Sequence, residues 1–237
     1  MKRPYVSIDI ETTGLDPSFC QVIEIGAVID DWDAPVEELK RFHAYVYHDR
    51  IVGQPYALQM NAAILLKIAN AEKAVRGVQP GDVADVTLDG DRFLRPKAVG
   101  RRFSQFLEKN GIVPGKAVLA AGKNFAGFDR PFLDLLPDFN VRFHHRVIDP
   151  AMLFWVPGVD DEPPATKTCM ERAGIAGEVA HTAVEDAIGV IKMVRFAARE
   201  SETAFTNDGK PMSAQEVARG LADHFLNRGQ FASQRKP

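Results

Sequence analysis

Apolar residues in the first fifty positions fall into three short runs separated by polar turns. Residues 5–10 and 21–31 are mainly apolar, and residues 41–48 alternate apolar and polar side chains with a period of two. Both patterns are typical of β-strands. Because the connecting segments are short, the sequence predicts three consecutive strands that form an antiparallel meander.

Helical spacing of the apolar residues follows this meander. It predicts one helix at about 57–75 and an amphipathic helix at 97–111, which would end at Gly111. Between them, residues 77–96 contain two turn signals, Pro80-Gly81 and Asp89-Gly90, and short apolar runs flank the second. We expect this segment to be a surface insertion that includes a small hairpin.

The pattern predicts two more strands in the second half of the chain. Residues 116–125 are typical of a buried strand and residues 144–149 of a fifth strand, with helices beginning at Asp129, at about 165 and at about 182. A meander followed by helices and parallel strands gives a mixed sheet. The predicted class is therefore α/β, with a mixed five-stranded sheet and helices on both faces.

The chain of 237 residues, 46% of them hydrophobic, suits one large domain with a small appendage. We expect residues 1–200 to form the domain and residues 201–237 to form a C-terminal helical extension with a basic tail. Ser213 and Glu216 have the spacing of a capping box for a helix in that extension. Such a helix would dock on the domain, form a homodimer or tether the protein to a polymerase.

Composition narrows the functional classes. The net charge of −3 and the isoelectric point near 6.1 give no overall attraction to nucleic acid, so binding would depend on local basic residues or on metal. Cys20 and Cys169 are far apart, which indicates neither a disulfide framework nor a zinc site. The sequence has no run of about 18 apolar residues and no signal peptide, so we expect a cytoplasmic protein that does not enter membranes.

Acidic residues supply the candidate chemistry. Asp9 and Glu11 are two apart at the end of the first predicted strand, so their side chains lie on one face and can share a metal ion. Alone, the pair fits a strand end that turns into solvent better than a metal site. The segment that follows, Thr12-Thr13-Gly14, offers hydroxyl and amide groups and permits close approach of a ligand to the backbone.

Two further acidic positions lie much later in the chain. Asp129 begins a predicted helix, where a capping role alone would explain it. Asp186 lies within a strongly apolar helix five residues after His181, and a buried Asp without a partner is costly. Glu185 is the alternative acid of that helix, and the apolar positions do not decide between the two. Carboxylates that converge repel one another, so a divalent cation is their expected partner.

Together these clusters resemble the motifs of the DEDDh family of 3′-to-5′ exonucleases, which includes the proofreading subunit of bacterial replicases, RNase T, oligoribonuclease and Trex-type DNases. The family's Asp-x-Glu motif followed by Thr and Gly matches residues 9–14. Its second motif matches Asn124 and Phe128-Asp129, and its third, His-x4-Asp, matches His181 and Asp186. The resemblance covers about residues 4–196, with the motifs in the family's order.

The resemblance implies a ribonuclease H-like fold and a site for two ions, Mg²⁺ or Mn²⁺. Asp9, Glu11 and Asp186 would bind the ion that activates water, Asp9 would bridge to a second ion on the leaving 3′-oxygen, and Asp129 would support that second ion. His181 would be the general base, since imidazole has an unperturbed pKa of about 6.5.

The implied substrate is the 3′ end of a single-stranded nucleic acid or a short oligonucleotide, from which nucleoside monophosphates are released. Residues 57–61 replace a segment that contacts the 3′ end in the family, so Leu58, Met60 and Asn61 become alternative contacts. This departure and the 77–96 insertion favour DNA over RNA. A polymerase-bound proofreading subunit, an RNA-directed enzyme and an inactive nucleic-acid-binding module are the alternatives. The candidate nucleic-acid contacts are Thr12, Thr13, Gly14, Leu15, Met60, Asn124 and Phe128.

Overall fold

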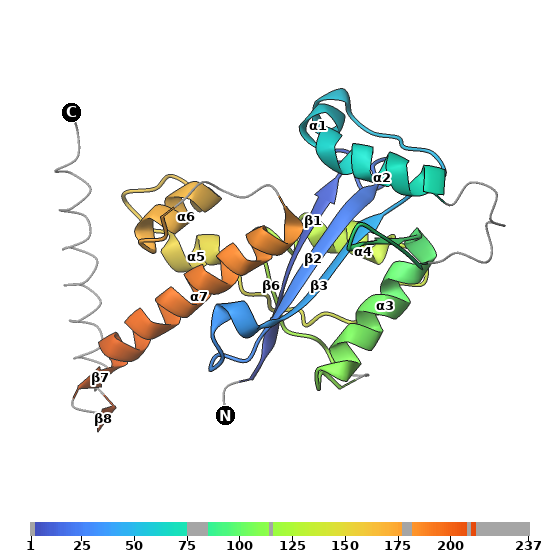
Figure 1. Ribbon diagram of the computed structural model, residues 1–237. Coiled ribbons are helices and arrows are strands. Elements are labelled where there is room, and N and C mark those ends of the chain that lie inside the picture. The colour runs from blue at the N-terminus through green and yellow to red at the C-terminus, as the bar shows by residue number, and fades with distance from the viewer. Residues whose placement is uncertain (1–2, 75–84, 114–115, 177–181, 208–209, 212–237) are drawn as a thin grey trace. The chain divides into compact units, whose positions relative to one another are not determined.

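The computed structural model describes residues 3–74, 85–113, 116–176, 182–207 and 210–211 (Figure 1). The chain divides into two compact units. The first contains residues 1–149 and 179–191, and the second contains residues 150–178 and 192–237. All the predicted site residues that the structure describes belong to the first unit.

A six-stranded mixed sheet forms the centre of the first unit (Figure 1). The order across it is β4-β5-β3-β2-β1-β6, and β1, β2 and β3 form the predicted antiparallel meander. At its two sides β5 pairs with β3 and β6 pairs with β1, both in parallel, which confirms the mixed sheet. The strands are β1 (Tyr5–Thr12), β2 (Val22–Asp30), β3 (Lys40–Val46), β4 (Asp85–Leu88), β5 (Asp91–Leu94) and β6 (Ala120–Ala121).

The sheet has six strands where five were expected, for two local reasons. The predicted hairpin around Asp89-Gly90 exists as β4 and β5, but it extends the sheet because Phe93 and Leu94 are buried in the core. Residues 144–149 were wrongly predicted as a continuous strand. The amides of His144 and Ile148 donate to the Val118 and Ala120 carbonyls, but the pairing amounts only to an isolated bridge from Ile148 to Ala121. The amide of Arg146 donates to His144 Nδ1 over 3.0 Å, a local bond that competes with strand pairing.

The predicted helices of the first unit are present with small changes. The helix expected at 57–75 is two helices, because Asn61 ends the first and its side-chain amide donates to the Thr12 carbonyl over 3.0 Å. Gly111 follows the amphipathic helix with a φ of +81°, as a C-terminal glycine should. The helices are α1 (Pro55–Met60), α2 (Ala62–Ala74), α3 (Pro96–Lys109), α4 (Asp129–Asp134) and α7 (Ala183–Phe205), with a short 3₁₀ helix at Val36–Glu38.

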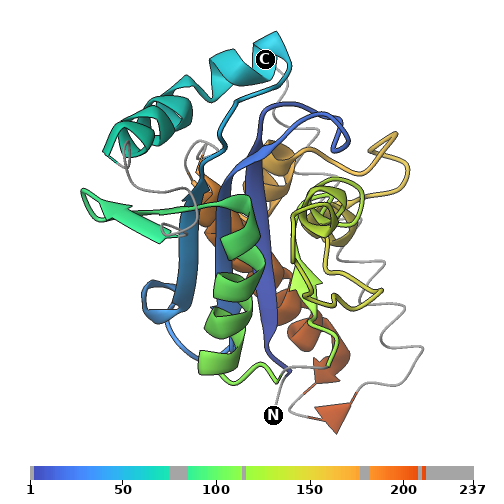
Figure 2. The same ribbon diagram turned by 90° about the vertical axis from the view of Figure 1, so that its right-hand side faces the viewer.

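Helices cover both faces of the sheet, as expected. Figure 2 shows α3 in front of the sheet and the beginning of α7 behind it. Ile8 and Ile10 of β1 pack with Phe103 of α3 in the main apolar core. Since successive strand residues point to opposite faces, the residues between them point towards α7.

The second unit contains α5 (Pro150–Phe154), α6 (Thr166–Arg172) and the later part of α7, followed by the short strands β7 (Thr206–Asn207) and β8 (Lys210–Pro211). Arg172 holds Asp160 through two bonds of 2.5 and 2.6 Å, and this guanidinium lowers the pKa of Asp160 to about 2. The boundary expected near residue 200 falls within α7, and the helix predicted from Ser213 lies outside the described residues. Within the described part of the chain, no helix has the length and hydropathy needed to cross a membrane.

Candidate metal centre

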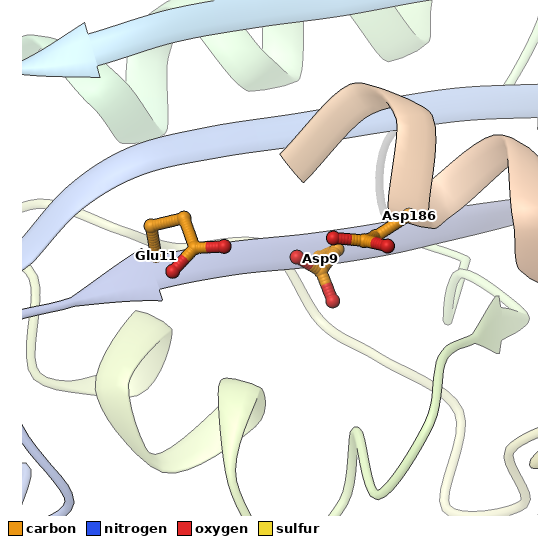
Figure 3. A group of neighbouring side chains, drawn as sticks. All are labelled: Asp9, Glu11 and Asp186. Atoms are coloured by element: carbon orange, nitrogen blue, oxygen red, sulfur yellow. The ribbon is translucent and has the colours of Figure 1, made fainter. Parts of the chain in front are cut away.

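Three carboxylates predicted from the sequence converge at one place on the sheet. Asp9, Glu11 and Asp186 each offer an oxygen, and these atoms lie within 4.8 Å of one another (Figure 3). Asp9 and Glu11 share a face of β1, while Asp186 comes from the first turns of α7. We call Asp9, Glu11, Asp129 and Asp186 the carboxylate cluster.

A glycine brings Asp186 to this position. Gly26 of β2 lies directly opposite Asp9 in the strand register, and a Cβ on it would collide with the backbone of Ala183 and Val184. The start of α7 therefore rests against bare backbone, and Asp186 follows within one turn. Glu185 points to solvent, so Asp186 is the acid of this helix that joins the cluster.

Asp129 is the most deeply buried member of the cluster. Only 2% of its surface is exposed, and its Oδ1 accepts a bond from the Ile10 amide over 3.2 Å. The N-cap of α4 is Phe128, so Asp129 is the first residue of the helix and not its cap. The bond to Ile10 fixes the carboxylate beside β1, next to Asp9.

The three aspartates of the cluster hold protons more tightly than ordinary carboxylates do. Burial raises the pKa of Asp9 well above its usual range, and the charges of Asp129 and Asp186 raise it further. Burial likewise raises the pKa of Asp129 to about 8, although backbone amides oppose the shift. Burial, then the charges of Glu11 and Glu24, raise the pKa of Asp186 to about 7.

These pKa shifts indicate which ligands the cluster can bind. At neutral pH the ionised form of such convergent carboxylates is unfavourable unless they bind protons or a cation. Carboxylate oxygens are the ligands that Mg²⁺ and Mn²⁺ prefer. The donor set therefore fits a divalent metal, with Asp9, Glu11 and Asp186 as the closest group.

Glu24 is a further acid near the cluster, and the sequence analysis did not single it out. It lies opposite Glu11 in the register, is 1% exposed, and raises the pKa of Asp9 and of Asp186. Its Oε1 is bonded to His43 Nε2 over 2.6 Å, while its Oε2 is buried without a hydrogen-bond partner among the described residues. A charged residue inside the apolar run 22–30 was the signal available in the sequence.

Asp149 also lies near the cluster. Its carboxylate accepts the backbone N–H of Asn124 over 2.9 Å, and its charge raises the pKa of Asp129. Asn124 adopts a positive φ of 55°, a conformation that Asn tolerates better than most residues. Asp149 therefore holds the turn that leads into α4, while the Asn124 side chain is exposed as a contact residue would need to be.

The threonines of the first motif serve the loop itself. Thr12 donates its hydroxyl to the Gly14 carbonyl over 2.7 Å, and Thr13 donates to the Val52 carbonyl over 2.6 Å. Both side chains are buried and both hydroxyls are bonded within the protein, so their contact with a ligand remains a prediction. Gly14 is needed because a Cβ there would lie 2.5 Å from Cys20 Sγ.

Exposed apolar side chains flank this loop. Leu15 is 74% exposed and Met60 is 55% exposed. The bond from Asn61 to Thr12 ties residues 57–61 to the first motif, which puts this segment beside the loop. Phe128, by contrast, is partly buried against the core and packs on Phe132. Of the predicted apolar contacts, Leu15 and Met60 thus remain the more accessible.

His181, the predicted general base, lies outside the described residues. The described chain resumes at Thr182, and Ala183 begins α7 against Gly26. Its role remains a prediction from the spacing of the third motif.

Comparison with known proteins gives a structural match only. No protein-family model and no curated protein matches the sequence. E. coli Exonuclease I in complex with a 5cy-dT13 oligonucleotide matches with a TM-score of 0.54 and 14% identity, over 86% of this chain and 42% of that one. The protein has a ribonuclease H-like fold. The fold class expected from the sequence is thereby confirmed.

Two further structures of E. coli Exonuclease I agree. Its complex with a dT13 oligonucleotide matches with a TM-score of 0.53 and 17% identity, over 86% of this chain and 44% of that one. The zinc-bound form of its complex with single-stranded DNA matches with a TM-score of 0.52 and 15% identity, over 85% of this chain and 42% of that one. The chain spans less than half the length of these exonucleases, and at such identity the likeness concerns the fold alone.

Proposed function

We propose that the protein is a metal-dependent exonuclease that removes nucleoside monophosphates from the 3′ end of single-stranded DNA. The observation that carries this proposal is the convergence of Asp9, Glu11 and Asp186 on a fold that matches Exonuclease I. The matching structures hold single-stranded DNA, which supports DNA as the substrate.

The carboxylate cluster would hold two divalent cations, Mg²⁺ or Mn²⁺. Asp9, Glu11 and Asp186 would bind one, and Asp9 and Asp129 would serve the second. Bound there, the cations supply activation of the attacking water and stabilisation of charge on the leaving 3′-oxygen. The amide bond from Ile10 keeps Asp129 in place for this role.

His181 would take the proton from the attacking water. Imidazole with a pKa of about 6.5 is suited to this task near neutral pH, so activity should rise with pH through that range. The terminal nucleotide would pack against Leu15 and Met60, which are exposed beside the first motif.

Two adjacent residues of α7 provide a matched test. Purified protein is incubated with a 5′-labelled single-stranded DNA in Mg²⁺ or Mn²⁺, with RNA and duplex DNA in parallel. The natural sequence and Glu185→Gln should produce a ladder that shortens from the 3′ end, whereas Asp186→Asn should not. Glu185 is exposed, so only Asp186 should be needed.

Other outcomes would replace the proposal. Binding without cleavage would indicate an inactive nucleic-acid-binding module. Cleavage only with a co-purified polymerase would indicate a proofreading subunit, and preference for RNA would change the substrate class. An unchanged rate and pH profile in His181→Ala would remove that residue as the base while leaving the metal centre intact.

A further inference from the structure

A second polar site lies at the outer edge of β3. It is a hollow of about 560 Å³ between the β4–β5 hairpin and α3. We call it the basic hollow, and its main lining residues are Arg41, Arg92, Arg102, Gln105, Phe106 and Lys109. None of these belongs to the carboxylate cluster.

The strand pairing explains why the hollow exists. The hairpin joins β3 only through Tyr45–Phe93 and Val46–Leu94, at the far end of that strand. The first half of β3, where Arg41 lies, is therefore not covered by β5. Helix α3 forms the opposite wall.

Positive charge is concentrated here although the whole chain carries a net charge of −3. Arg41, Arg92, Arg102 and Lys109 line the hollow. Asp85 contacts two of these cations, at 2.8 Å from Arg102 and 3.5 Å from Arg92. One carboxylate does not neutralise four cations, so the hollow has an excess of positive charge.

Individual groups in the hollow are available to a ligand. Arg41 and Lys109 are exposed. The Nε of Arg102 is buried and has no hydrogen-bond partner among the described residues, although its two terminal nitrogens are engaged with Asp85 and Gln105. Because that Nε is buried, Arg102 contributes a fixed positive charge to the hollow, while Arg41 and Lys109 supply the accessible donors.

The arrangement suits a chain of phosphates better than a single anion. The cations come from β3, the hairpin and α3, so they are spread along three walls. Phe106, which is only partly buried, adds an aromatic surface of the kind on which bases stack. Phosphate contacts from Arg and Lys together with base stacking are the usual means of binding single strands.

We propose that the basic hollow binds the phosphodiester backbone of a single nucleic-acid strand, as a second contact away from the carboxylate cluster. This inference rests on the proposed function only for the identity of the ligand. A strand held at both places must be long, so the hollow should favour long substrates over short ones.

The test measures binding to the full chain carrying Asp186→Asn, so that the strand is not cut. Fluorescence anisotropy follows 5′-labelled single-stranded DNA of about 4 and about 20 nucleotides. Arg41→Glu with Lys109→Glu alters the hollow. Lys40→Glu with Arg101→Glu is the matched control, because these exposed residues lie on the same β3 and α3 outside the main lining residues and change the charge equally.

We expect the hollow variant to bind the long strand at least about 10-fold more weakly than the control, with the short strand affected equally in both. The dependence of log affinity on log salt should also become shallower by about 0.7 for each phosphate that the variant no longer neutralises. A milder pair, Arg41→Gln with Lys109→Gln, should also weaken binding of the long strand more than that of the short strand. Thermal unfolding checks that each variant is folded.

Equally weakened binding in the hollow and control variants would overturn the proposal, as would equally weakened binding of short and long strands. Competition by pyrophosphate, with no effect of strand length, would overturn it in favour of a free anion. Hydrolysis is scored separately in otherwise natural protein. Failure to cleave would count against the proposed function, whereas cleavage with no length-dependent weakening of binding would count only against the hollow.

Discussion

The two faces of β1 and β2 are built from alternate residues of the same strands, yet they have opposite chemistry. Towards α3 lie Ile8, Ile10, Ile25 and Ala27, all buried in the main core. The intervening positions towards α7 are Asp9, Glu11, Glu24 and Gly26. Apolar burial on one face stabilises the folded protein, while the other face brings like charges together.

The difference shows how the fold tolerates its site. Carboxylates that are buried and crowded on a sheet destabilise it: burial first, and neighbouring charges after it, raise the pKa values of Asp129 and Asp186. The apolar face on the same strands provides compensating stability. Changes on the α7 side should therefore act mainly on chemistry, and changes on the α3 side mainly on stability.

The largest effect should come from Asp9→Asn. Removing a charge from the centre of the cluster should lower the rate of hydrolysis by at least about 10³-fold, since metal ions supply several kcal/mol of transition-state stabilisation. The metal-free protein should not become less stable, because repulsion is relieved. Asp16→Asn, in the exposed loop that follows, should retain activity. A strong decrease in stability in Asp9→Asn would contradict the division between the faces.

Phe103→Ala tests the other face. Phe103 is fully buried against Phe42 and Phe139, so its truncation should lower the free energy of unfolding by about 3–5 kcal/mol. Urea unfolding measures this change. Phe19→Ala is the control, because that side chain is 53% exposed and should cost far less. The rate per folded molecule of Phe103→Ala should stay within a few-fold of the natural one, and a decrease as large as that of Asp9→Asn would show that the faces are not separable.

Gly26→Ala should affect both stability and metal binding, because Gly26 lies where α7 meets the strands. A methyl group would press on the backbone of Ala183 and Val184. This clash should lower the free energy of unfolding by about 1–3 kcal/mol and shift Asp186. Unfolding and Mn²⁺ titration measure the two effects. Gly189→Ala, in the same helix with open space at its Cβ, should be neutral or slightly stabilising. Unchanged Mn²⁺ binding in folded Gly26→Ala would show that this contact does not position the carboxylate.

The smallest effect concerns pH. Asp129 has a folded pKa of about 8 against an unfolded value of about 3.9, so the folded state binds the extra proton and its stability should decrease as pH rises from about 4 to 8. The melting temperature of metal-free protein should fall by a few degrees between pH 5.5 and 8, and Mn²⁺ should restore it mostly at the higher pH. Asp129→Asn should flatten the dependence. A melting temperature that rises over this range would contradict the raised pKa.

Local patterns were enough to predict much of this molecule. The period-two spacing placed Asp9 and Glu11 on one face, and the apolar alternation identified the meander. The choice between Asp186 and Glu185 depended on the rotation of α7 against Gly26, which is a contact across the fold that spacing does not encode. Glu24 was missed for the same reason, since its importance comes from its partner in the register, Glu11.

The sheet edges were the weaker part of the prediction. Whether the hairpin at 85–94 lay on the surface or in the sheet depended on pairing between Tyr45 and Phe93, which are far apart in the chain. Residues 144–149 pair with residues 118–122 at His144 and Ile148, but between these points the Arg146 amide donates to the His144 side chain and not to a neighbouring strand. Non-local pairing decided the first case and a local side-chain bond the second.

The contact between Gly26 and Ala183 also limits how related sequences can vary in length. It fixes the angular position of α7 from its first residue, and each helical residue turns the chain by about 100°. Inserting or deleting one residue between Ala183 and Asp186 would swing the carboxylate to another side of the helix. Insertions ahead of His181 would change neither that angle nor the spacing of the third motif. Related sequences should therefore vary in length before His181 but not between His181 and Asp186.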